Sequence, residues 1–100
     1  MKYKVLLRGG NFQASIDGRT SRYGFFTTRF VEAETPAAAG QLAEELVRGD
    51  PHLQAVVRNA PTDPPTIHLE SLWEMESFGD VMVPGAGYSW FSEEEAGPAR

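Results

Sequence analysis

A chain of 100 residues is long enough for one domain with a single modest core. Hydrophobic residues make up 41% of the chain and its formal net charge is -5, as in many soluble globular proteins. The absence of cysteine excludes a disulfide framework and a thiolate zinc site. No apolar run is long enough to span a membrane and no signal-peptide pattern opens the chain, so we expect a cytoplasmic location and no membrane partner.

The first part of the chain predicts strands. Apolar and polar residues alternate over residues 2–8, which indicates a strand with one buried face. Gly9-Gly10-Asn11 interrupts the pattern, and residues 12–16 then form either a bulged continuation or a second short strand. Asp17-Gly18 is a turn signal which, together with residues 19–21, predicts a polar hairpin loop.

Residues 22–34 predict a central strand antiparallel to the first, because both alternating sets of side chains contain aromatic or β-branched residues. One set includes Arg29 and ends in the small side chains that lead into a helix, so we assign it to the helix side. Phe26 and Phe30 then point away from the helix. An exposed pair of large rings is a typical contact site. Either a C-terminal segment or another subunit is therefore expected to cover them.

Thr35-Pro36 predicts the start of a helix, since threonine accepts hydrogen bonds from free backbone N–H groups and proline has no N–H to leave unpaired. The helix should run to about Arg48 and end at Gly49. Asp50-Pro51 repeats the start signal and predicts a short second helix. The residues expected to face the sheet are Ala39, Leu42, Ala43, Leu46 and Val47.

The chain after the helices predicts a proline-rich loop over residues 59–65 and a long strand over residues 66–78. Residues 88–91 form either an edge strand or a covering flap, and residues 92–100 should be a disordered acidic tail. Strict alternation divides the long strand into two faces. Ile67, Leu69, Trp73 and Met75 are expected on one face, and His68, Glu70, Glu74 and Glu76 largely on the other.

The order of strands, helices and strands is typical of the α+β class. We predict a single domain over residues 1–91, built from an antiparallel sheet of four to five strands with one long and one short helix on one face.

Charge is distributed unevenly along the chain. Residues 1–30 contain six basic residues against one acidic residue, whereas residues 31–100 contain three basic residues against thirteen acidic ones. If the early strands lie beside the late acidic strand, cross-strand ion pairs balance this difference, and we favour that interpretation. The alternative is a basic patch for an anionic partner.

No residue pattern indicates catalysis. His68 and Glu70 share a strand face, but two ligands do not make a metal site. Glu70, Glu74 and Glu76 are explained as surface charge on a solvated strand. We therefore expect no enzyme activity, no metal and no cofactor.

The run Tyr23-Gly-Phe-Phe-Thr-Thr-Arg-Phe30 resembles the aromatic strand of RNA-recognition motifs, in which rings stack on bases. It departs from that motif at Phe26, where glycine or alanine is usual, and at Thr27, where an aromatic residue is usual. No helix precedes the strand either. Nucleic acid is therefore not our expected partner.

The opening Met-Lys-Tyr-Lys-Val5 and the later Val-Glu-Ala-Glu-Thr-Pro-Ala-Ala-Ala39 resemble the β-β-β-α-β pattern of HicB-like antitoxin domains, over about the first half of the chain. This resemblance implies a small basic protein as partner. The chain as a whole is similar to small bacterial α+β proteins that have a Phe-Thr-Thr-Arg-Phe-Val strand, a likeness that implies no activity.

We expect a non-enzymatic binding or protein-interaction module. It would self-associate as a homodimer or larger homo-oligomer, or bind a small protein, through a sheet surface bearing Phe26, Phe30 and Trp90. One alternative is a small-ligand or enzyme-accessory domain, whose pocket is lined by Arg29, Tyr88 and Trp90. Another is a HicB-like antitoxin-type partner.

Overall fold

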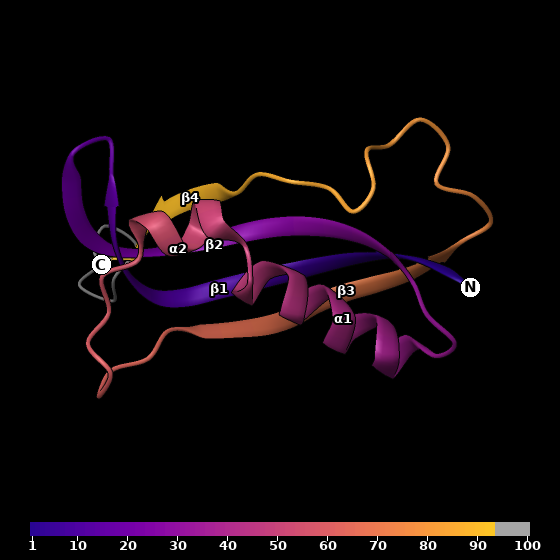
Figure 1. Cartoon of the computed structure of the whole chain (residues 1–100), viewed down its shortest axis with the longest axis horizontal. Helices are drawn as coiled ribbons and strands as arrows, with labels where there is room; N and C mark the ends of the chain where they lie inside the picture. Colours follow the sequence, from indigo (N-terminus) through magenta and orange to yellow (C-terminus); the bar gives the residue numbers. More distant parts are fainter. Residues whose placement is uncertain (94–100) are drawn as a thin grey trace, which may run out of the picture.

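The structure is a computed structural model in which residues 1–93 are described. Its elements are β1 (Lys2–Ile16), β2 (Arg19–Glu32), α1 (Pro36–Arg48), α2 (Pro51–Val56), β3 (Thr66–Met75) and β4 (Ser89–Ser92). The strands form one antiparallel sheet in the order β3-β1-β2-β4, and both helices lie on the same side of it (Figure 1). The predicted α+β class is confirmed, and the described part of the chain has four strands where four to five were predicted.

A long hairpin of β1 and β2 forms the centre of the sheet. β1 continues through a bulge between Gly9 and Phe12, so residues 12–16 belong to the same strand rather than to a second one. Asp17 and Gly18 both have positive φ, 52° and 76°, which completes the chain reversal in two residues. β2 therefore begins already at Arg19, and the predicted polar loop is shorter than expected.

The proline-rich loop between α2 and β3 fixes the bulge of β1. The Asn59 side chain donates to the Asn11 carbonyl at 2.8 Å and accepts from the backbone N–H of Gln13 at 2.9 Å. These two bonds satisfy backbone groups of β1 beyond Gly10, where the pairing with β3 has ended. The loop thus has a structural role although it contains no regular structure.

α1 begins and ends where the sequence predicts. The Thr35 hydroxyl accepts from the backbone N–H of Ala38 at 3.1 Å, and the Gly49 N–H donates to the Glu45 carbonyl at 3.0 Å. The buried line of the helix follows every fourth residue, and Leu42 lies at its edge with 39% of its surface exposed. The apolar side chains that form the core are Tyr3, Val5, Leu7, Phe12, Phe25, Val31, Ala39, Ala43, Val47, Leu53 and Ile67.

The predicted face pattern of the long third strand is wrong beyond Glu70. The pairing of β3 with β1 changes register here, since Leu7 lies opposite Leu69 whereas Leu6 lies opposite Ser71. The extra residue is a bulge that exchanges the two faces of the strand. Ile67 and Leu69 consequently share one side, as predicted, and this is the helix side, but Trp73 and Met75 lie on the opposite side.

β3 ends at Met75, three residues before the predicted end. The Ser77 hydroxyl accepts from the backbone N–H of Gly79, whose φ of 59° belongs to a turn. β4 extends to Ser92, and Glu93 donates its backbone N–H to the Arg22 carbonyl. The remainder of the predicted acidic tail, residues 94–100, lies outside the described residues. Within those described, neither helix combines the length and the apolar character needed to cross a bilayer.

Candidate binding surfaces: the open face and the Arg29 cleft

The side of the sheet opposite the helices, here called the open face, gathers aromatic and basic side chains. Strand pairing places these residues on one surface, because directly paired residues point to the same side. Phe26 and Trp73 are 38% and 47% exposed. The open face includes Lys2, Lys4, Leu6 and Arg8 of β1, Phe26, Thr28, Phe30 and Glu32 of β2, His68, Ser71, Trp73 and Met75 of β3, and Phe91 of β4, with Phe78 beside Phe30.

Arg8 lies between two aromatic rings of the open face. Its guanidinium carbon is 5.9 Å from the ring centroid of Phe26 and 5.9 Å from that of Phe91, and the two rings are 5.7 Å apart. The Phe91 ring lies directly over Gly24, where any side chain would collide with it. Arg8 is thereby held by ring faces and keeps an exposed charge.

Two lysines of β1 make similar contacts farther along the strand. The Lys4 ammonium is 5.4 Å from the ring centroid of Trp73, and that of Lys2 is 5.9 Å from the centroid of Phe78. All three cations of this strand face are thus placed over aromatic rings.

The expected cross-strand ion pairs between the first strand and the acidic one are not formed. Because of the bulge at Glu70, Glu74 lies opposite Tyr3 on the helix side, and Lys4 lies opposite Trp73. The ion pairs within the described chain are Arg29–Asp50 and the surface pair Arg48–Glu44 on α1. On the open face, Glu32 of β2 lies opposite Lys2, whereas Lys4 and Arg8 have no carboxylate directly opposite them on either neighbouring strand.

The structure brings together two of the three residues expected to form the interaction surface. Phe26 and Phe30 lie on the open face, whereas Trp90 pairs with Phe25 and points to the helix side. There its ring packs at 5.3 Å from Phe25. Phe91, the next residue, takes the place expected for Trp90. Alternation predicts opposite sides for these two neighbours, but only the pairing register decides which side each one takes.

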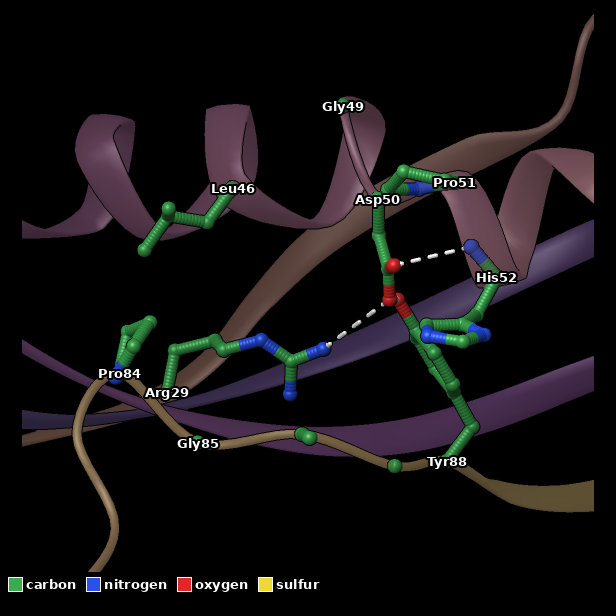
Figure 2. A pocket seen from close by; sticks show the side chains of 11 residues that line it. Arg29, Leu46, Gly49, Asp50, Pro51, His52, Pro84, Gly85 and Tyr88 are labelled. Carbon is green, nitrogen blue, oxygen red and sulfur yellow. Dashed lines mark hydrogen bonds and ion pairs between the residues drawn. The ribbon is translucent and has the colours of Figure 1, made fainter.

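A second candidate site, here called the Arg29 cleft, lies on the helix side, where the junction of α1 and α2 approaches the segment before β4 (Figure 2). It has a volume of about 380 Å³. Figure 2 shows the Arg29 guanidinium and the Asp50 carboxylate facing each other within it. The residues that line it are Arg29, Leu46, Gly49, Asp50, Pro51, His52, Pro84, Gly85, Ala86, Gly87 and Tyr88.

Arg29 is 3% exposed, which is rare for a charged residue and requires polar partners. Its Nη1 donates to the Thr27 hydroxyl and to the Thr28 carbonyl, the latter at 2.9 Å. The Thr27 hydroxyl in turn donates to the Gly87 carbonyl at 2.6 Å, which ties β2 to the segment before β4. The guanidinium also lies 5.2 Å from the ring centroid of Tyr88.

Asp50 connects the helix junction to this network. Its Oδ2 accepts from the Tyr88 hydroxyl at 2.6 Å and lies 3.8 Å from Nη2 of Arg29, and its Oδ1 accepts from the backbone N–H of His52 at 3.0 Å. The hydrogen bond from Tyr88 is the main reason that the pKa of Asp50 is below its ordinary value. Asp50 is therefore ionised at neutral pH and opposes the charge of Arg29.

Burial, and then the bond to Asp50, raise the pKa of Tyr88 well above its ordinary value of 10.0. A phenol with a raised pKa in the folded state contributes stability that is complete below about pH 10 and is lost as the pH rises further. We expect the free energy of unfolding to fall as the pH rises above about 10, and to fall less steeply in Tyr88→Phe. Urea denaturation at several pH values measures both slopes. Equal slopes in the two proteins would contradict this assignment.

Of the residues expected to form a ligand pocket, Arg29 and Tyr88 line this cleft. Trp90 packs against Tyr88 in a tilted arrangement, with the ring centroids 5.9 Å apart, but does not line the cleft. Asp50 was interpreted from the sequence only as a helix cap, which it is, so its second role was missed. His52 was missed as well, because no local signal relates the α1–α2 junction to a segment near residue 88.

Within residues 1–93, no three histidine, aspartate or glutamate side chains gather closely enough to hold a metal ion. His68 instead lies opposite Arg8 on the open side of the sheet, and Glu70 is the bulged residue of β3.

Comparison with known proteins gave no match: no family model, no curated protein and no solved structure is similar to this chain. The resemblance to HicB-like antitoxin domains therefore stays a prediction.

Proposed function

We propose that this chain is a binding module whose contact surface is the open face, and that its partner is single-stranded nucleic acid. The observation that carries the proposal is the row of cations on β1, namely Lys2, Lys4 and Arg8, each placed over an aromatic ring.

The chemistry of the open face fits single-stranded nucleic acid. Exposed rings such as Trp73 and Phe26 offer flat surfaces on which bases stack, and stacking contributes about 1–3 kcal/mol per base. The neighbouring cations supply contacts to phosphates, which dominate affinity for nucleic acids. Both kinds of group alternate across adjacent strands, so one extended ligand can contact them together.

Charge is divided between the two sides of the sheet. On the helix side, Arg48 and Arg29 pair with Glu44 and Asp50, and Glu45 and Glu74 add further negative charge. On the open face, Lys2, Lys4 and Arg8 outnumber Glu32. The net charge of -5 therefore understates the attraction of the open face for an anion. This division also disfavours direct pairing of the open faces of two copies, because it would bring like charges together.

The test is fluorescence anisotropy of labelled single-stranded oligonucleotides, titrated with the full chain at low and at moderate salt. Binding that weakens as salt rises is expected, since released counterions contribute to affinity. Arg8→Ala and Trp73→Ala should each weaken binding roughly fivefold or more. Arg48→Ala is the matched control, because it removes the same charge from an exposed position on α1.

Two outcomes contradict the proposal. One is an absence of binding at low salt, and the other is equal loss of affinity in Arg8→Ala and Arg48→Ala. Light scattering over a range of protein concentrations distinguishes the second candidate, self-association, which the exposed Phe26 and Trp73 rings favour. A dimer that Phe26→Ser dissociates, in a chain that binds no oligonucleotide, would assign the open face to a second copy instead.

A further inference from the structure

We propose that the Arg29 cleft binds a small zwitterion that carries a carboxylate and an ammonium group close together, namely an α-amino acid with an apolar side chain. The cleft lies on the helix side of the sheet, so this inference does not depend on the function proposed for the open face.

The Arg29 guanidinium has N–H donors that are available to a ligand. The guanidinium has five N–H donors. Nη1 uses its two donors on Thr27 and Thr28, and Tyr88 makes a side-chain hydrogen bond with the guanidinium as well. Within the described chain, two donors on the Nε and Nη2 side therefore remain for a ligand. The nearest carboxylate oxygen, Oδ2 of Asp50, is 3.8 Å from Nη2, beyond hydrogen-bonding distance.

The open donors belong to a buried group that faces a cavity. Arg29 is 3% exposed and lines the cleft, so its charge is screened little by solvent. The Nε and Nη2 edge of a guanidinium matches the two oxygens of a carboxylate, and such paired hydrogen bonds are among the strongest in proteins. A ligand carboxylate is therefore the group that this edge accepts best.

The position of the Asp50 carboxylate favours a ligand that also carries a positive charge. A simple anion beside Arg29 would meet the Asp50 carboxylate, which lies close to the same guanidinium. That carboxylate accepts two hydrogen bonds, from Tyr88 and from the backbone of His52, and can accept about two more. An ammonium group can use these positions, and it removes the repulsion that a simple anion would experience.

The remaining wall of the cleft selects an apolar side chain. Leu46, Pro51, Pro84 and Ala86 line it beside the charged pair. The volume of about 380 Å³ is within the range of small-ligand sites and leaves room for such a side chain. The chemistry of the cleft thus has three parts: a carboxylate contact, an ammonium contact and an apolar contact.

Isothermal titration calorimetry of the full chain tests the three contacts with three related probes. Leucine carries all of them, N-acetylleucine lacks the ammonium, and 3-methylbutylamine lacks the carboxylate. Titrated up to about 10 mM, leucine should bind, and each of the other two should bind roughly tenfold or more weakly. This comparison uses the unaltered protein and does not depend on the folding of any variant.

Variants assign the contacts to residues. Arg29→Lys keeps the charge but loses the planar fork, and Asp50→Asn loses the negative charge; each should weaken leucine binding roughly tenfold. Arg48→Lys, the same exchange at an exposed position, should leave it unchanged. No leucine binding in the unaltered chain, or equal binding of leucine and N-acetylleucine, would overturn the proposal. Oligonucleotide binding tests the open face separately.

Discussion

Replacing Phe25 by alanine is expected to lower the free energy of unfolding by about 3–5 kcal/mol, the range typical of large aromatic residues removed from a core. Phe25 is fully buried on the helix side of β2. Its ring contacts three others, with centroids 4.9 Å from Phe12, 4.9 Å from Tyr88 and 5.3 Å from Trp90. The cavity would therefore open where β1, β2 and β4 meet, and little nearby can move to fill it.

The matched control is the next residue. Phe26→Ala removes the same group from the open face, where the ring is 38% exposed, so the loss should be roughly 1–2 kcal/mol. Urea denaturation followed by circular dichroism measures both changes. Similar losses for the two variants would contradict the assignment of Phe25 to the core and Phe26 to the surface.

Gly9→Ala is expected to destabilise the protein by about 1–3 kcal/mol or more, although it adds a single methyl group. Gly9 lies opposite Phe25 in the ladder, and the Phe25 ring covers the position that a Cβ atom would take. Because that ring is held on several sides by other aromatic residues, it cannot move aside without disturbing the core.

Gly10→Ala provides the control for this second prediction. A Cβ atom at Gly10 would lie 3.3 Å from the Thr66 hydroxyl and 3.4 Å from the Glu93 carboxylate, both of which can shift. We expect a loss of less than about 1 kcal/mol, measured by the same denaturation experiment. A larger loss at Gly10 than at Gly9 would show that the bulge, not the Phe25 ring, determines the need for glycine here.

The elements that the sequence predicted correctly are those with strong local signals. Thr35 and Pro36 define the start of α1 through groups within one helical turn, and Asp17-Gly18 defines the hairpin through its own backbone conformation. The assignment of Arg29 to the helix side also needed only alternation along one strand. Such features depend on neighbours in the sequence, so they can be predicted without knowledge of the tertiary structure.

The incorrect predictions concern relations between distant segments. No glycine near Glu70 predicts the bulge from the sequence, because the bulge results from the way β3 pairs with β1. The side taken by Trp90 depends on its register with Phe25. The Arg29 cleft combines β2, the helix junction and the segment before β4, so the sequence could suggest Arg29 and Tyr88 but not the carboxylate between them.

The bulge in β3 also affects the behaviour of the sheet edge, where β3 has a neighbouring strand on one side alone. β3 is the outermost strand on one side of the sheet, and a long, regular outer strand is a template for amyloid-like growth. An incoming strand that followed β3 would lose its spacing at Glu70, where the ladder is offset by one residue, and would meet exposed carboxylates at Glu70 and Glu74. The irregularity that exchanges the two faces of β3 therefore also protects the chain against strand-by-strand polymerisation.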